Sequence, residues 1–162
     1  MKTWQRRTIG ILTLGGSATG FVIVLQELFN GAGDNYWLII LLAALILYGF
    51  GVFVGVMIFE DHDRMRQFAL PFWALQIPYL TSAWLSFEFS SGARFILALT
   101  EGASIEFYGG AGSRFSFYLA NGAPFSIGVN FVAIVIFLFF LDLTNKPDYL
   151  PKEEPSSNDS DV

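Results

Sequence analysis

The longest apolar run of the chain covers residues 36–59, YWLIILLAALILYGFGVFVGVMIF, and contains no charged side chain. A helix of this length rises about 36 Å, which exceeds the roughly 30 Å hydrocarbon core of a bilayer. Core helices of soluble proteins rarely run so far without a polar face. The pattern therefore predicts a membrane-spanning helix.

Three further apolar segments, residues 8–29, 68–87 and 125–143, predict three more spans. Pro78 lies inside the third segment, where a helix is expected to kink because proline donates no hydrogen bond. Residues 1–143 are expected to form a single domain. The sequence thus predicts an all-α membrane protein, a four-transmembrane-helix bundle with a small extracytoplasmic β-hairpin or three-stranded meander between helices three and four.

Small residues recur at helical spacing in the first two segments. Gly16 and Gly20 form one small-xxx-small pair, and Gly51 and Gly55 form another. Because glycine has no side chain, such pairs allow two helix backbones to approach closely. They predict contact between the first two spans.

Polar side chains within the predicted third and fourth spans are candidate intramembrane contacts. Gln76, Tyr79 and Ser82 recur at helical spacing, and Asn130 is an amide within an apolar run. A buried amide needs hydrogen-bond partners, and Gln76 or Tyr79 are candidates for Asn130. We expect these residues to join helices, with the lining of a small cavity as the alternative.

Residues 88–124 differ from the rest because they are rich in glycine, serine and aromatic residues. Alternation around residues 109–112 predicts an extracytoplasmic β-hairpin that pivots at Gly110. In this register Glu106 pairs with Arg114, Ser104 with Ser116, and Ile105 with Phe115. Residues 93–99 would add a third strand through the turn TEGA, so two or three strands are expected.

The predicted hairpin also supplies a candidate partner-binding face. Aromatic side chains offer large contact areas at a low entropic cost, and strand edges can pair with another chain. The candidate residues are Phe107, Tyr108, Arg114, Phe115, Phe117 and Tyr118. The alternative is that these rings pack on the end of the bundle or lie in the membrane interface.

Composition excludes several kinds of chemistry. Hydrophobic residues make up 54 % of the 162 residues and charged residues 14 %, which suits a small multi-pass protein. Without cysteine the chain has no disulfide, thiolate metal site or cysteine nucleophile. The single histidine, His62, lies among Glu60, Asp61 and Asp63, a group that we interpret as a solvated turn. No catalytic, cofactor or metal site is expected, and we do not expect an enzyme.

The distribution of basic residues predicts the orientation. With four spans, seven of the nine lysines and arginines lie on the side of the termini, and only Arg94 and Arg114 lie on the other. The positive-inside rule then makes both termini cytoplasmic and residues 88–124 periplasmic, in a bacterial inner membrane. An uncleaved first helix is favoured over a signal peptide, because residues 8–25 exceed a usual apolar region. The acidic, proline-containing residues 144–162 are expected to be a disordered cytoplasmic tail.

Two functions remain open at this stage. The first is a small integral membrane protein that acts by binding or assembly, as an accessory subunit, an assembly factor or an immunity-type protein. The alternative is an oligomeric small-solute transporter or channel, lined by the polar residues of the third and fourth spans. The expected partners are the lipid bilayer, a membrane or periplasmic protein or a second copy of the chain, and no nucleic acid.

Overall fold

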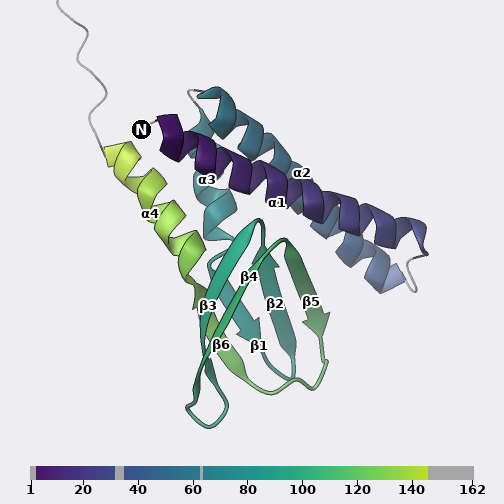
Figure 1. Ribbon diagram of the computed structural model, residues 1–162. Helices are drawn as coiled ribbons and strands as arrows, with labels where there is room; N and C mark the ends of the chain where they lie inside the picture. Colours follow the sequence, from purple (N-terminus) through teal and green to yellow (C-terminus); the bar gives the residue numbers. More distant parts are fainter. Residues whose placement is uncertain (1–2, 32–34, 63, 146–162) are drawn as a thin grey trace, which may run out of the picture.

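The computed structural model describes residues 3–31, 35–62 and 64–145. Of the predicted disordered tail, residues 144–162, only Thr144 and Asn145 are described, and they end a helix. Helices gather at one end of the molecule and a sheet at the other (Figure 1). In chain order the elements are α1 (Thr3–Phe29), α2 (Asn35–Glu60), α3 (Met65–Ala74), β1 (Pro78–Thr81), β2 (Leu85–Ser90), β3 (Ala93–Thr100), β4 (Ile105–Ala111), β5 (Arg114–Leu119), β6 (Ser126–Asn130) and α4 (Phe131–Asn145).

The predicted four-helix membrane bundle is wrong, because much of the chain between α3 and α4 forms a six-stranded antiparallel sheet. Among the described residues, only α1 and α2 are long and apolar enough to cross a membrane, judged by length and composition. The predicted third span, residues 68–87, divides into α3, β1 and the start of β2. Pro78 begins β1 instead of kinking a helix, which fits proline's place at the first position of a strand.

The predicted fourth span, residues 125–143, is also wrong. It divides into β6 and α4, and α4 has 15 residues. A helix of that length rises about 22 Å, which falls short of a bilayer core. The apolar run covers both elements because a buried strand and a buried helix have the same average hydropathy.

The predicted contact between the first two long helices is confirmed. A Cβ on Gly20 would overlap the ring of Tyr48, and one on Gly51 would overlap Ser17. The backbone of α1 at Leu14 leaves no room for a side chain at Gly55. These glycines therefore set the close approach of α1 and α2.

Aromatic rings form the core at the junction between the helices and the sheet. Phe72 and Trp73 of α3, Tyr48 of α2, Phe89 of β2 and Phe140 of α4 are all buried. The ring of Phe89 lies 5.4 Å from that of Tyr48 and 5.9 Å from that of Phe72, measured between centroids. The core thus fastens β2 to two helices.

The strand order of the sheet is β4-β3-β6-β1-β2-β5, and every neighbouring pair is antiparallel. β4 and β5 follow each other in sequence but lie at opposite edges. The predicted hairpin about Gly110 is therefore wrong, and so are its pairs of Glu106 with Arg114, Ser104 with Ser116 and Ile105 with Phe115. The third predicted strand is present as β3, and it pairs with β4 across the turn at residues 101–104.

The two faces of the sheet differ in chemistry. Strand pairing places one set of side chains on the same side, which we call the polar face. It comprises Tyr79, Thr81, Ser86, Glu88, Ser90, Arg94, Ile96, Ala98, Thr100, Glu106, Tyr108, Gly110, Arg114, Ser116, Tyr118, Ser126, Gly128 and Asn130. The opposite, apolar face carries mostly leucine, isoleucine, valine and phenylalanine. The helices α2, α3 and α4 contact the apolar face at Phe89 and Phe95. On the polar face, Tyr118 near the end of β5 also contacts a helix, because it stacks on Trp37 of α2.

Candidate functional site

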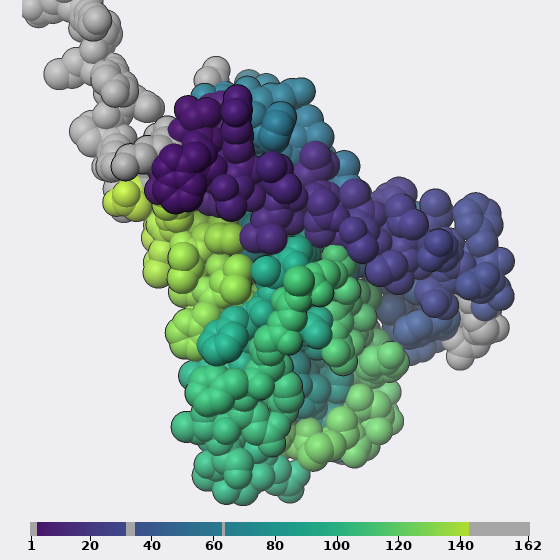
Figure 2. Space-filling view, in the orientation of Figure 1, coloured from purple at the N-terminus to yellow at the C-terminus, as the bar shows by residue number. Residues whose placement is uncertain are grey.

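A hollow of about 380 Å³ lies on the polar face of the sheet. Residues from five strands line it, namely Tyr79, Glu88, Arg94, Ile96, Phe107, Tyr108, Gly109 and Arg114. Because strands β1 to β5 all contribute, the sheet must curl around this face. Figure 2 shows the hollow opening between β4 and β5, the two edge strands.

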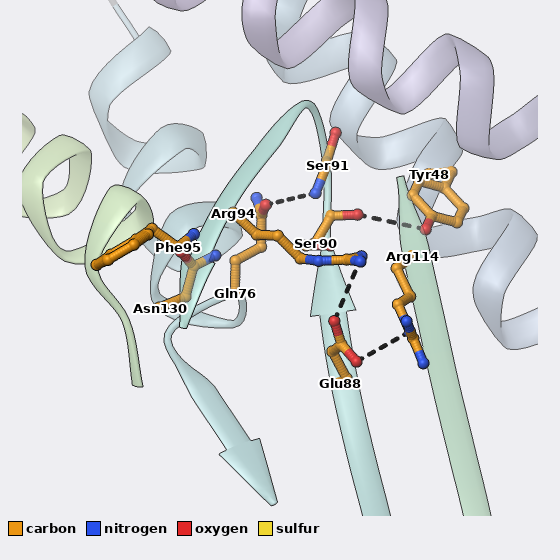
Figure 3. A network of polar contacts seen from close by, with 9 residues as sticks. All are labelled: Tyr48, Gln76, Glu88, Ser90, Ser91, Arg94, Phe95, Arg114 and Asn130. Carbon is orange, nitrogen blue, oxygen red and sulfur yellow. Dashed lines mark hydrogen bonds and ion pairs between the residues drawn. The ribbon is translucent and has the colours of Figure 1, made fainter. Parts of the chain in front are cut away.

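Three charged side chains meet in the hollow (Figure 3). Glu88 is buried, and one carboxylate oxygen lies 3.0 Å from Nε of Arg114 while the other lies 3.5 Å from a terminal nitrogen of Arg94. Burying a carboxylate is costly unless a cation and hydrogen bonds compensate it. Two guanidinium groups around one carboxylate leave the three residues with one surplus positive charge.

Tyr79 and Tyr108 face each other across the hollow, with ring centroids 6.0 Å apart. The Tyr108 hydroxyl donates a hydrogen bond to the carboxylate of Glu106. This bond raises the pKa of Tyr108 to about 12. The Tyr108 side chain is therefore uncharged at physiological pH and lines the hollow as a neutral, polar group.

A second polar group lies where the tip of the sheet meets the helices. The Ser91 backbone N–H donates to Oε1 of Gln76 at 2.8 Å, and the hydroxyls of Ser91 and Ser17 are 2.8 Å apart. The Tyr48 hydroxyl donates to the carbonyl of Ser90 at 3.4 Å. Figure 3 shows how this junction lies above the charged group. It joins α1, α2 and the segment after α3 to the β2–β3 turn.

Asn130 links β6 to α4. Its Oδ1 accepts hydrogen bonds from the backbone N–H of Val132, at 3.2 Å, and of Phe95, at 3.1 Å. The first is a helix N-cap, because Asn130 directly precedes α4. Neither Gln76 nor Tyr79 bonds to the Asn130 side chain, so the predicted contacts with these two residues are wrong. Gln76 and Asn130 are only 1 % and 2 % exposed.

Tyr79 and Ser82 do not extend a polar helix stripe with Gln76. Tyr79 lies in β1 and points into the hollow. Ser82 lies in the β1–β2 turn, where its hydroxyl donates to the carbonyl of Leu85. The predicted stripe is therefore dispersed over three different kinds of local structure.

The six residues predicted as one partner face divide between two places. Phe107, which is exposed on β4, lines the hollow together with Tyr108 and Arg114. Phe115 packs on Phe89 with centroids 6.3 Å apart. Two others lie beside the helices: Phe117 lines a second cavity of about 330 Å³ between the α1–α2 hairpin and β5, and Tyr118 stacks on Trp37.

Sequence reasoning missed Glu88, Arg94, Ser90 and Ser91 as site residues. A signal was present, because Ser86, Glu88 and Ser90 alternate with aromatic residues in SFEFS. That period of two is typical of a strand with one polar face. Across the part of the chain that the structure describes, no three histidine, aspartate or glutamate side chains gather closely enough to hold a metal ion.

Comparison of the chain with protein-family models, with curated proteins and with solved structures finds no match.

Proposed function

We propose that the chain is a small integral membrane protein that acts by binding. In this proposal α1 and α2 anchor it in the bilayer, and the open edge of β4 pairs with an extended, apolar segment of another membrane protein. The observation that carries the proposal is the exposed edge strand β4 beside a helix hairpin with an apolar surface.

The surfaces of α1 and α2 support the membrane anchor. Only 33 % of the most apolar window of α1 and 39 % of that of α2 are buried, whereas a core helix of a soluble protein is mostly buried. Side chains such as Ile11, Ile39 and Ile46 are more than half exposed. Contact with lipid would remove this apolar area from water.

One end of the helix hairpin is basic. Arg6 and Arg7 lie near the start of α1, and Arg64 and Arg66 follow α2. Arg6 forms an ion pair with Asp61, which holds the two ends together. By the positive-inside rule this end lies in the cytoplasm. The proposal therefore keeps the predicted orientation, with the sheet toward the periplasm of a bacterial inner membrane.

The sheet lies beside the half of the α1–α2 hairpin that is further from its basic end. Ser113, directly before β5, donates a hydrogen bond to the carbonyl of Gly16 at the midpoint of α1. Tyr118, near the other end of β5, stacks on Trp37 at the start of α2, with centroids 6.0 Å apart. If the hairpin spans the bilayer, β5 runs from the bilayer centre to its outer surface. The apolar face of the sheet then lies at the depth of the outer leaflet.

The edge of β4 defines the kind of partner. All seven residues of β4 are exposed, including Ile105 at 63 % and Phe107 at 65 %. Among the described residues, β4 pairs only with β3, so its outer backbone groups have no strand beside them. Lipid cannot satisfy backbone N–H and C=O groups, whereas another strand can. The segment IEFYGGA also lacks the lysine and proline that often protect edges.

Site-directed cross-linking tests this proposal, because the chain has no cysteine. A Phe107→Cys variant in its native membrane should cross-link to one polypeptide, which mass spectrometry identifies. Phe107→Lys should abolish co-purification of that polypeptide at stoichiometric level. The control is Trp84, which is 80 % exposed before β2: Trp84→Cys should give no such adduct and Trp84→Lys should leave co-purification intact.

Three results would overturn the proposal. The first is identical adducts from the two cysteine variants, and the second is a cross-link only to a second copy of the chain. The third is unchanged recovery of the partner with Phe107→Lys. The alternative of an oligomeric transporter or channel stays a prediction. Its expected lining residues Gln76 and Asn130 are almost fully buried at the junction, so it is the second choice.

A further inference from the structure

We propose that the hollow on the polar face binds an oxyanion, a phosphate or carboxylate group, between Arg94 and Arg114. The hollow shares Phe107, Tyr108 and Gly109 with the β4 edge that the proposed function uses. Its arginines lie on β3 and β5, so variants of Arg114 test the hollow and variants of Phe107 test the edge, and the two proposals fail by different results.

The charges in the hollow favour an anion. Arg94, Arg114 and Glu88 all line it, and their sum is one positive charge. Glu106 lies further along β4 on the same face, does not line the hollow, and accepts the hydroxyl of Tyr108. A surplus positive charge beside low-dielectric walls concentrates anions.

The guanidinium groups of Arg94 and Arg114 have N–H donors that do not contact Glu88. Each guanidinium has five N–H donors in a planar fork that matches carboxylate and phosphate oxygens. The contacts to Glu88 involve one nitrogen of Arg94 and one of Arg114. Arg114 is 55 % exposed, which means that a solute can reach it. A structural role alone would need only one of these cations to neutralise Glu88.

A buried hydroxyl that lacks a hydrogen-bond partner in the described part of the chain lies next to Arg114 on the same face. Ser90 lies directly opposite Arg114 in the strand register and is 1 % exposed. Its hydroxyl has no hydrogen-bond partner among the described residues, although buried hydroxyls are nearly always bonded. Ser90 shares a face with Glu88 and Arg114 but does not itself line the hollow. Its unpaired hydroxyl shows that hydrogen-bonding capacity on this face is unused next to the proposed site.

The size of the hollow limits the ligand. A volume of about 380 Å³ is near the lower end of small-molecule sites. It suits the anionic group of a small metabolite, or the phosphate of a lipid headgroup. The rings of Tyr79 and Tyr108 would flank the less polar part of such a molecule.

Anion-dependent stabilisation of the full chain tests the site. The melting temperature is measured by tryptophan fluorescence in neutral detergent, with inorganic phosphate or acetate replacing chloride at constant ionic strength. A parallel arm uses nanodiscs of phosphatidylcholine with and without phosphatidylglycerol. A shift with phosphate or acetate indicates a soluble ligand, and a shift only with phosphatidylglycerol indicates a lipid headgroup. Either shift supports the oxyanion site, and no shift in any arm overturns it.

Two variants separate a binding site from a purely structural ion pair. Arg114→Gln should weaken the anion effect by about tenfold or more, since it removes charge-assisted hydrogen bonds. Arg7→Gln, which removes the same charge outside the hollow, should not. Glu88→Gln should strengthen anion binding, because it frees both guanidinium groups. If Glu88→Gln gives no tighter binding, or if Arg7→Gln weakens it as much as Arg114→Gln, the proposal is wrong.

Discussion

Gly16, at the midpoint of α1, lies directly against the backbone of Gly92 in the β2–β3 turn. A Cβ on Gly16 would overlap the nitrogen and Cα of Gly92. Gly92 itself has a φ of +94° and faces the carbonyl of Leu12, so it also favours glycine. The pair therefore allows the backbones of α1 and the β2–β3 turn to approach without a side chain between them.

Replacing Gly16 should push α1 and the β2–β3 turn apart. Gly16→Ala is expected to destabilise the protein by about 1–3 kcal/mol, because backbone on both sides has to shift. Thermal or denaturant unfolding in detergent measures the change, and the buried indole of Trp73 is a suitable fluorescence reporter. Gly15→Ala is the matched control, since nothing lies within 4 Å of its Cβ position. Equal effects of the two variants would show that the contact with Gly92 does not limit stability.

Gln76 should be required for stability. Gln76→Leu leaves the Ser91 N–H without its acceptor, and a buried unpaired donor costs about 1–3 kcal/mol. The same unfolding assay compares this variant with Gln67→Leu on the exposed surface of α3. A Gln76→Leu protein of normal stability that has lost solute flux in liposomes would instead support the transporter alternative.

Asn130 should act through its carbonyl oxygen. Asn130→Ala removes the acceptor for Val132 and Phe95, and loss of an N-cap alone costs about 0.5–2 kcal/mol. Asn130→Ser keeps a side-chain oxygen at the N-cap without burying a charge, and serine is one of the preferred N-cap residues. Nδ2 of Asn130 has no partner among the described residues, so losing the amide nitrogen breaks no hydrogen bond. Stability measurements should rank serine above alanine, and the reverse order would exclude the capping role.

The proposed orientation predicts which loops are labelled from outside. Ser104→Cys, in the β3–β4 turn, should react with a membrane-impermeant maleimide in intact cells. His62→Cys, after α2, should react only after permeabilisation. The opposite pattern would invert the orientation, and labelling of both in intact cells would mean that the hairpin does not separate them.

The helix hairpin could be predicted from the sequence because its signal is local. Gly20, Gly51 and Gly55 lie in long apolar runs, and each meets the neighbour that the small-residue spacing indicates. The secondary structure after Ala74 could not be predicted in this way. Pro78 fits a helix kink and a strand start equally well, and the run after Phe125 continues from β6 into α4 without a polar break.

The candidate site was missed because strand partners are not encoded by neighbours in sequence. Arg114 is only eight positions from Glu106, and a tight turn lies between them, so a local hairpin is the natural interpretation. The acidic partner of Arg114 is instead Glu88. The two residues meet because β2 pairs with β5. Alternation identified the polar side of β4 and β5, but it carries no information on which strand lies beside which.

The position of β6 also determines when the sheet can assemble. β6 is the last strand in sequence, yet it lies in the interior of the sheet, between β3 and β1. Before it is synthesised, the chain has only a β3–β4 pair and a separate β1-β2-β5 group. Joining these halves depends on contacts far apart in sequence, which are slow to form. The hollow takes its lining from both groups of strands, so it can form only after residues 126–130 have been synthesised.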